Sequence, residues 1–227
     1  MKNTIPRRAS RRTEEQKGIH LMLIKTLPVG MLETNCYVVT DEDTKKCVII
    51  DPGADSATIL DYVESNNLTP VAVFLTHGHY DHHQALDAVI EETGVPAYIH
   101  ESEVNRGGQK GRHKLDDNGK LTFYAEGDEI DAGNLKFSVI ETPGHSLGSV
   151  TLICNDALFT GDTLFRRDCG RTDLEGGSED VMMQSLKRLA ELEGDYEVYP
   201  GHAESSMLSY ERSFNGYMKY ATGDLEQ

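Results

Sequence analysis

The sequence predicts an α/β fold, and three observations support this prediction. Short runs rich in β-branched residues alternate with stretches whose apolar residues recur at helical spacing. The order of strands, helix, strands and helix occurs twice along the chain. Four of the strands end in turns that carry histidine or aspartate, which is typical of sites at the carboxyl edge of open α/β sheets.

The first half of the chain begins with three expected strands. Residues 23–27, 36–40 and 47–50 are short β-rich runs, which Gly30 and the polar turn at 41–43 separate from one another. Turn residues between short strands are typical of hairpins, so we expect an antiparallel start to the sheet.

A βαβ unit is expected to follow these strands. Ile59, Leu60 and Val63 recur at helical spacing within residues 54–66, and residues 71–75 form an uninterrupted apolar run that predicts a buried strand. Strand, helix and strand in this order indicate a parallel pair with a crossover helix. The loop after residue 75 then lies at the carboxyl edge of the sheet.

The rest of the chain repeats the order of strands and helices. We expect a helix over 83–93 and another over 178–192, which Ser178 caps at its amino end. The remaining expected elements are strands over 135–140, 149–154 and 157–160, a last strand over 197–199, and a single short helix over 209–219.

Two segments are set apart from this fold. Residues 1–20 are basic whereas the rest of the chain is acidic, and we interpret them as a disordered or non-native extension before a natural start at Met22. Residues 21–227 are expected to form a single domain. Residues 105–120 are rich in glycine and basic side chains and predict a mobile loop, which at this length is often functional.

The composition narrows the classes of partner. The 227 residues include 22 Lys and Arg against 38 Asp and Glu, and a net charge of -16 repels phosphate backbones, so no nucleic-acid partner is expected. No apolar run approaches the roughly 20 residues of a membrane span. Because a secretory signal is also missing, we expect no membrane partner and a cytoplasmic protein. The sequence leaves the oligomeric state open.

The four cysteines form no Cys-x-x-Cys pair, which fits free thiols in a reducing compartment. Cys36 and Cys47 could still face each other on neighbouring strands.

The loop after the βαβ unit gives the strongest chemical signal. Residues 76–83 read Thr-His-Gly-His-Tyr-Asp-His-His, so imidazoles and a carboxylate stand at the spacing His-x-His-x-Asp-His. Neutral imidazole is the commonest metal ligand, and carboxylate is a harder ligand that suits Zn, Mn or Fe. A surface loop or the remains of an affinity tag explains the segment less well, because tags are terminal and unbroken. The segment therefore predicts a metal site.

Three further segments place a ligand directly after a strand. His145, Asp162 and His202 each follow an expected strand, and a glycine before each of them lets the backbone pass close to an ion. Together with His77, His79, Asp81 and His82 of the first segment they supply five histidines and two aspartates. Seven ligands are too many for one tetrahedral ion but fit two metal ions that share a carboxylate and a water.

At these residues the sequence resembles the metallo-β-lactamase superfamily, and within it the short hydrolases similar to glyoxalase II, the hydroxyacylglutathione hydrolase. The resemblance covers residues 22–215 and implies an αββα sandwich, with two mixed β-sheets between outer helices. The matching motifs are Thr-His-Gly-His-Tyr-Asp-His at 76–82, Thr-Pro-Gly-His-Ser-Leu-Gly-Ser at 142–149, Thr-Gly-Asp-Thr-Leu-Phe at 160–165, Cys-Gly-Arg-Thr-Asp at 169–173 and Tyr-Pro-Gly-His at 199–202.

The resemblance also assigns roles to single residues. Asp51 resembles the family's supporting aspartate behind the ligand loop, and a simple turn former before Pro52 is its equal alternative. For the seven ligands the resemblance implies a first metal bound by His77, His79 and His145, a second bound by Asp81, His82 and His202, and Asp162 as the bridge. The other histidines are expected on the surface or in loops, with His83 at the start of a helix: His20, His83, His100 and His113.

The family chemistry that the resemblance implies is hydrolysis. Two divalent ions, expected to be zinc with iron or manganese as alternatives, would activate a bridging hydroxide that attacks the carbonyl carbon of a thioester such as S-lactoylglutathione. Asp81 would orient this nucleophile and accept its proton. A thioester suits such a site because its thiolate leaves without an acid and is held by the soft zinc ion.

Recognition of the thiol depends on residues outside the ligand set. By resemblance, Arg171 would bind a glutathione carboxylate through its planar guanidinium, and a pair with Asp168 or Asp173 is the alternative. Because only 25 residues follow His202, we expect no counterpart of the helical C-terminal domain that completes the glutathione site of full-length glyoxalase II. The basic loop over 106–114 is a hypothetical substitute that would attract an anionic substrate through Arg106, Lys110 and Arg112.

Four other functions are alternatives to thioester hydrolysis. The motif Cys-Gly-Arg-Thr-Asp also resembles the persulfide dioxygenases, which use one iron bound by two histidines and one aspartate. A β-lactamase is disfavoured because Asp162 stands where the common class of those enzymes has a cysteine, and because no export signal is present. An RNA-processing nuclease would need a basic exosite, which the net charge argues against. A non-catalytic binding module would not need an intact ligand set.

Overall fold

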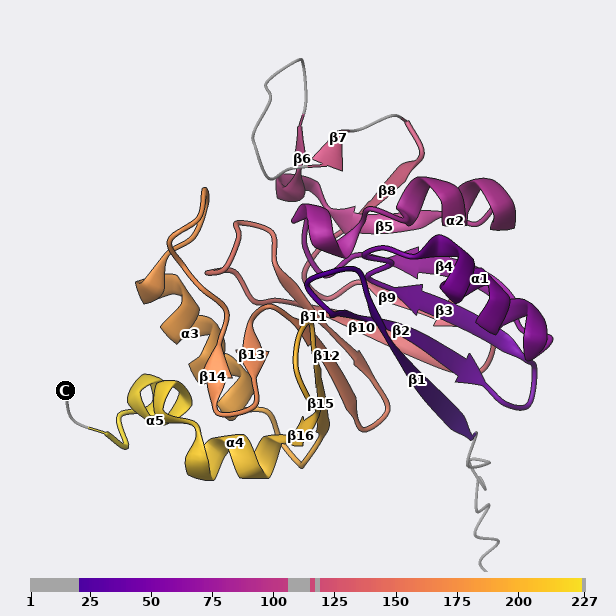
Figure 1. Ribbon diagram of the computed structural model, residues 1–227. Helices are drawn as coiled ribbons and strands as arrows, with labels where there is room; N and C mark the ends of the chain where they lie inside the picture. Colours follow the sequence, from indigo (N-terminus) through magenta and orange to yellow (C-terminus); the bar gives the residue numbers. More distant parts are fainter. Residues whose placement is uncertain (1–20, 106–114, 117–118, 226–227) are drawn as a thin grey trace, which may run out of the picture.

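The structure is a computed structural model that describes residues 21–105, 115–116 and 119–225. Two β-sheets pack face to face, and helices cover both outer faces (Figure 1). This is the αββα order of layers that the sequence predicts. The basic segment 1–20 and the loop residues 106–114 lie outside the described residues, so the expectations for both stay predictions.

The first sheet has six strands in the order β1-β2-β3-β4-β5-β8. β1 (Met22–Val29), β2 (Thr34–Asp41) and β3 (Lys46–Ile50) are antiparallel neighbours, which confirms the predicted start of the sheet. α1 (Ser56–Ser65) connects β3 to β4 (Thr69–Phe74), and these two strands are parallel. The βαβ unit is thereby confirmed.

The predicted start of the second helix at His83 is wrong. Residues 80–82 form the 3-10 turn η1 (Tyr80–His82), in which the His83 amide donates to the carbonyl of Tyr80, and α2 (Leu86–Thr93) begins only afterwards. The Ala85 amide donates to the carbonyl of Pro52, so it too is outside the helix. Asp81 and His82, two of the predicted ligands, therefore lie in this turn and not in the α-helix.

Several short elements follow α2 and were not predicted, because runs of two to four residues carry little periodic signal. Two of the strands extend the first sheet in parallel. These elements are β5 (Ala97–His100), η2 (Glu101–Glu103), β6 (Val104–Asn105), β7 (Leu115–Asp116) and β8 (Leu121–Tyr124).

The second sheet has the order β16-β15-β12-β11-β10-β9 and is also mixed, since β12 and β15 are parallel and the other pairs antiparallel. The predicted last strand is followed by one more, β16. The strands are β9 (Glu129–Ala132), β10 (Leu135–Glu141), β11 (Val150–Cys154), β12 (Ala157–Gly161), β15 (Glu197–Pro200) and β16 (Ser206–Met207), and a small hairpin of β13 (Leu164–Phe165) and β14 (Asp168–Cys169) stands apart.

The helices on the second sheet are α3 and two short C-terminal helices. Ser178 caps α3 (Glu179–Ala190) by accepting a hydrogen bond from the amide of Val181, as predicted. The single C-terminal helix expected from the sequence is instead divided into α4 (Leu208–Phe214) and α5 (Gly216–Thr222). Asn215 causes the break, because its extended backbone ends α4 and its side chain caps the amides of α5.

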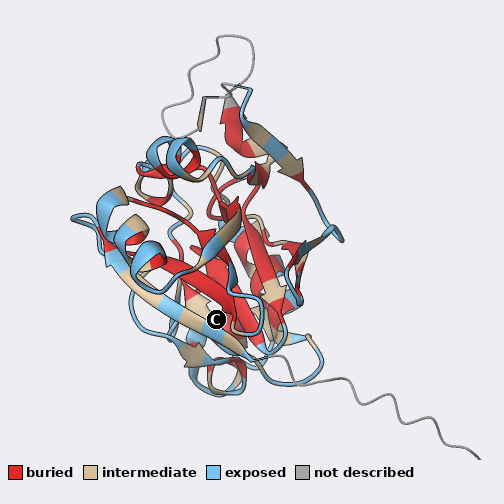
Figure 2. Cartoon of the chain, turned by 90° about the vertical axis from the view of Figure 1, so that its right-hand side faces the viewer, coloured by how far each residue is buried: buried red, intermediate tan, exposed pale blue. Residues whose placement is uncertain are grey.

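Three hydrophobic clusters hold the four layers together. The central cluster lies between the sheets, where the rings of Phe74 and Phe137 are 5.2 Å apart and those of Phe137 and Phe159 are 6.4 Å apart. The outer clusters lie under α1 and α2 and under α3 and α5. Figure 2 shows the buried residues gathered along the strands and the exposed ones on the outer helices. This packing fixes the strand ends from which the site is built.

Backbone hydrogen bonds join the two sheets at one end of the sandwich. The amide of Val150 donates to the carbonyl of Thr76, and the amide of Asn35 donates to the carbonyl of Gly201. The loops that follow β4 and β15 are therefore tied to strands of the opposite sheet. The loops that were predicted to carry ligands meet at this end.

Two further expectations concern the whole chain. All four cysteines are free thiols, and Cys36, Cys47 and Cys154 are buried, so the alternative of a Cys36–Cys47 bridge is not realised. Among the described residues, no helix is both long enough and apolar enough to cross a membrane.

Candidate metal centre

The seven side chains predicted as metal ligands come together in one cluster. They lie in the loops that follow β4, β10, β12 and β15, so four strand ends supply them. Within each of three overlapping groups, the ligand atoms lie within 4.8 Å of one another. The groups are His77, His79 and His145; His77, His82 and Asp162; and Asp81, His82 and His202.

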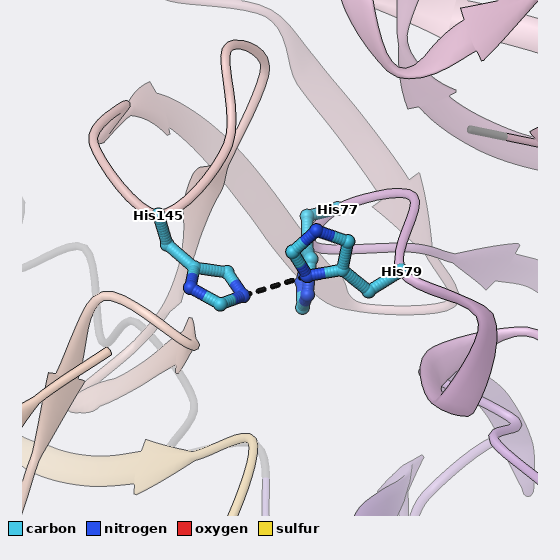
Figure 3. A group of neighbouring side chains, drawn as sticks. All are labelled: His77, His79 and His145. Atoms are coloured by element: carbon cyan, nitrogen blue, oxygen red, sulfur yellow. Dashed lines mark hydrogen bonds between the residues drawn. The ribbon is translucent and has the colours of Figure 1, made fainter. Parts of the chain in front are cut away.

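The first group consists of three buried histidines that point toward one another (Figure 3). Nδ1 of His79 and Nε2 of His145 are 2.7 Å apart, and the rings of His77 and His79 meet edge to face at 4.8 Å between centroids. Zn–N bonds are about 2.0 Å long, so an ion between these nitrogens would need only a small separation of the rings.

Asp81, His82 and His202 form a second ligand group, and Asp162 lies next to it. Oδ2 of Asp81 is 3.3 Å from Nε2 of His202 and 3.6 Å from Nε2 of His82. Asp162 lies between the two groups, because its Oδ2 is 3.4 Å from Nε2 of His145 and its Oδ1 is 3.4 Å from Nε2 of His82. This is the position expected of a bridging carboxylate.

The imidazole nitrogens that face away from the cluster are held by hydrogen-bond acceptors. An acceptor at Nδ1 keeps the ring proton there and leaves the lone pair of Nε2 directed into the cluster. Such contacts orient a metal-binding histidine. The pairs are His77 Nδ1 with Thr76 Oγ1 at 3.1 Å, His82 Nδ1 with Asp51 Oδ2 at 3.0 Å, His145 Nδ1 with the Arg171 carbonyl at 2.7 Å, and His202 Nδ1 with the Leu32 carbonyl at 3.1 Å.

Asp51 is a turn residue whose side chain hydrogen-bonds to Thr76 and His82 in the loop that follows β4. Its carboxylate is buried and accepts hydrogen bonds from the Thr76 amide and hydroxyl, each at 2.7 Å, and from Nδ1 of His82. Its backbone has a φ of 50°, so it is also a turn residue. The two interpretations of Asp51 that the sequence left open therefore both describe part of its role.

Burial and neighbouring charges shift the pKa values of several residues in the cluster. Burial lowers the pKa of His77 well below its usual range, so its imidazole is neutral at neutral pH, the form that binds metal. Burial alone would lower the pKa of His82 too, but the carboxylates of Asp162 and Asp51 outweigh it and raise that pKa. Burial would raise the pKa of Asp162, and His82 more than offsets this. A bound ion would replace the proton of His82.

The residues present fit a divalent metal ion. Nε2 of His77 is buried in the cluster and has no hydrogen-bond partner among the residues that the structure describes. A buried polar atom without a partner costs about 1–3 kcal/mol, so such atoms call for a ligand. Imidazole nitrogen and carboxylate oxygen are the donors that Zn, Fe and Mn take.

Glycine is required next to two of the ligands. A Cβ atom at Gly201, beside His202, would collide with Oδ1 of Asp162. At Gly161, beside Asp162, a Cβ would collide with the hydroxyl of Thr76, and φ is +47° there. The prediction that these glycines let the backbone approach the site is confirmed.

Glu103, which no sequence pattern singled out, ends η2 and is buried. Its Oε2 accepts a hydrogen bond from the Gly78 amide at 2.8 Å, and its Oε1 accepts one from the Gly148 amide at 2.6 Å. Glu103 thus joins the loop of His77 and His79 to the loop of His145. No spacing rule connects residue 103 to either loop, so only the three-dimensional structure reveals this contact.

Two histidines outside the ligand set differ from expectation. His100 was expected on the surface or in a loop, but it ends β5 and its Nε2 lies 3.2 Å from Oε1 of Glu141. It is mostly buried because β5 is an inner strand of the sheet. His83 follows η1 rather than starting a helix. His20 and His113 lie outside the described residues.

A cavity of about 510 Å³ opens beside the cluster. Arg171 lines it, and its Nε and Nη2 donate to the two carboxylate oxygens of Asp173 at 2.7 and 2.8 Å. The alternative pairing considered for Arg171 is therefore present, and its predicted contact with substrate remains a prediction. The other residues around the cavity are Leu32, His79, Tyr80, Asp81, His145, Asp162, Phe165, Leu174 and His202.

Comparison with known proteins identifies the fold family. The family model of the metallo-beta-lactamase superfamily matches residues 29–202, which is more than half of the chain. The chain belongs to the metallo-β-lactamase superfamily. Members of this superfamily are usually metal-dependent hydrolases, which agrees with the donor set of the cluster.

Relatives of the chain include a protein named probable metallo-hydrolase YqgX from Bacillus subtilis, which is 34% identical over 208 residues, 86% of this chain and 96% of the relative. Three solved structures are also similar. They are the BLEG-1 B3 metallo-beta-lactamase (32% identity, TM-score 0.77, 86% of this chain and 99% of that chain), ETHE1 from Myxococcus xanthus (30%, 0.76, 89% and 85%) and TTHA1623 in a di-iron-bound form (31%, 0.72, 85% and 99%).

Proposed function

We propose that this member of the superfamily is a dinuclear metal hydrolase that cleaves thioesters, the reaction of glyoxalase II-like enzymes. The observation that carries the proposal is the position of Asp162, whose two oxygens each lie 3.4 Å from a histidine of a different ligand group. In the proposal His77, His79 and His145 would hold the first ion, Asp81, His82 and His202 would hold the second, and Asp162 would bind both.

Two divalent ions bound in this way supply a Lewis acid and lower the pKa of a water molecule toward neutrality. The chain's own residues provide the positioning. His202 lowers the pKa of Asp81 despite the opposing effect of burial, so Asp81 is a carboxylate at neutral pH. Asp81 lines the cavity and accepts a hydrogen bond from the Thr34 hydroxyl at 3.2 Å, which restrains it. We assign to it the orientation of the attacking water and the acceptance of its proton.

Several observations support hydrolysis over the dioxygenase alternative. A dioxygenase with one iron needs only two histidines and one aspartate, whereas the second group of Asp81, His82 and His202 is also assembled here. The Bacillus relative is named as a metallo-hydrolase, and one similar structure was solved in a di-iron-bound form. The proposal leaves zinc, iron and manganese as candidates for the ions. Its substrate is a small thioester in the cytoplasm, and no nucleic acid or membrane takes part.

Thiol release from S-lactoylglutathione by the metal-loaded protein tests the proposal. We expect turnover that a chelator abolishes and that the Asp162→Ala variant lacks. A matched control is Asp61→Asn, because Asp61 is exposed on α1. Oxygen uptake with glutathione persulfide, without thiol release from any thioester, would move the assignment to a dioxygenase.

A further inference from the structure

We propose that the cavity beside the ligand cluster binds an apolar acyl group, so that the protein prefers thioesters of aliphatic or aromatic acids to thioesters of small hydroxy acids. This inference rests on the proposed thioester hydrolysis and specifies its substrate class. Two observations support it. The side chains that form the walls of the cavity are apolar, and Arg171, the one lysine or arginine that lines the cavity among the described residues, is paired with Asp173.

The cavity has a polar floor and apolar walls. The floor consists of ligand residues, and the walls are formed by Leu32, Tyr80, Phe165 and Leu174. Phe165 touches the ligand set directly, since its ring lies edge to face with that of His202 at 6.2 Å between centroids. A group that packs against these walls would hold its carbonyl carbon beside the cluster.

Two of the apolar wall residues are open to solvent. Leu32 and Tyr80 are 53% and 54% exposed. Exposed apolar side chains that gather at one opening are typical of binding sites. A volume of about 510 Å³ lies within the range of small-molecule sites.

The backbone of one wall residue, Leu32, is held in place before a substrate arrives. The Leu32 carbonyl accepts the hydrogen bond from Nδ1 of His202, which ties the turn between β1 and β2 to the ligand set. On the other side of the turn the Gly30 amide donates to Asp55 at 2.8 Å. A preorganised apolar surface loses less conformational entropy on binding, which strengthens selection by shape and polarity.

The charges around the cavity also favour an apolar acyl group over an anionic one. Arg171 is the one lysine or arginine that lines the cavity within the described part of the chain, and Asp173 accepts hydrogen bonds from the Nε and Nη2 edge of its guanidinium. The charge of Arg171 is therefore already balanced by a neighbouring carboxylate. The described cavity offers apolar area rather than an unpaired positive charge.

The reaction on such a substrate needs no further reactant. Water adds its oxygen to the acyl carbon, the carbon–sulfur bond breaks, and one proton of the water ends on the departing thiolate. The products are a carboxylic acid and a thiol, with no change in oxidation state.

A series of glutathione thioesters that differ only in the acyl group tests the inference. We would measure kcat/KM of the metal-loaded protein for lactoyl, acetyl, butyryl and hexanoyl esters by thiol release. We expect kcat/KM to rise about threefold per added methylene, and the hexanoyl ester to exceed the lactoyl ester. Equal or falling values along the series would overturn the acyl preference and leave the hydrolase proposal standing. Absence of thiol release from every ester would overturn the hydrolase proposal itself.

The Leu174→Asn variant tests whether this cavity determines the preference for long acyl groups. Leu174→Asn should reduce the ratio of hexanoyl to acetyl kcat/KM about tenfold, and a ratio within one protein is independent of the fraction that is folded. Leu23→Asn is the matched control, because Leu23 is 46% exposed on β1 and does not line the cavity. Calorimetry with S-hexylglutathione and S-methylglutathione gives a second readout without turnover. A ratio and an S-hexyl affinity that Leu174→Asn leaves unchanged would contradict the assignment.

Discussion

Oε2 of Glu103 accepts a hydrogen bond from the backbone amide of Gly78, with 2.8 Å between the two atoms. Its other oxygen accepts from the amide of Gly148 at 2.6 Å, so one buried side chain joins two loops that carry ligands. The packing also explains both glycines. A Cβ atom at Gly78 would press against Glu103, and one at Gly148 would press against His100 and Glu103. The loops of His77 and His145 are thus held at a fixed separation.

The first prediction concerns this contact. Glu103→Gln presents an amide group to one of the two backbone amides, so one loop loses its acceptor and the first ligand group loosens. We expect metal affinity to fall about 10- to 100-fold, as for other residues that orient ligands. Competition with a chromophoric chelator measures it. Glu101→Gln, an exposed position in the same turn, is the control, and equal affinities for both variants would refute the role of Glu103.

The second prediction concerns Asp51, which holds Nδ1 of His82 at 3.0 Å. Asp51→Asn places a donor where three hydrogen-bond donors already converge, so His82 loses its fixed orientation. We expect the affinity for the ion of the group of Asp81, His82 and His202 to fall about 10- to 100-fold. The other ion should be affected less, because Asp51 reaches His77 only through the Thr76 hydroxyl. Metal titration followed by calorimetry separates the two binding steps. A uniform loss at both steps would contradict the assignment of His82.

The ligand set could be predicted from the sequence because each ligand follows an apolar strand within a few residues, and strand ends meet at one edge. The three antiparallel strands at the start and the βαβ unit were predictable because their apolar runs are bounded by turn residues. Glu103 and the carbonyls of Leu32 and Arg171 were not, because these contacts join segments far apart in the chain. The break at Asn215 was missed since its side chain caps only in the folded state.

The third prediction concerns the core between the sheets. Phe159 is fully buried and its ring meets those of Tyr37 and Tyr199 at 5.3 Å. Phe159→Ala removes these contacts and leaves a cavity, so the free energy of unfolding should fall by about 3–5 kcal/mol. Denaturant unfolding measures the change. Phe214→Ala, at a side chain that is 60% exposed, should change it by less than about 0.5 kcal/mol.

The fourth prediction concerns pH. Arg188 lowers the pKa of Glu126 from its ordinary value of 4.5, so their ion pair stabilises the fold above that pH and the effect is lost as pH falls through the lowered pKa. Both side chains are more than a third exposed, which limits the contribution to less than about 1 kcal/mol. The difference in unfolding free energy between wild type and Arg188→Ala should therefore shrink below pH 4.5. A difference that grows on acidification would contradict this account.

The measurement that tests the central claim most directly is the metal content of the purified protein, determined by mass spectrometry on wild type and Asp162→Ala after saturation and removal of free ions. The account predicts about two divalent ions per chain in wild type and fewer than two in the variant, because Asp162 touches both ligand groups. One ion per chain in wild type, unchanged by Asp162→Ala, would contradict the dinuclear centre.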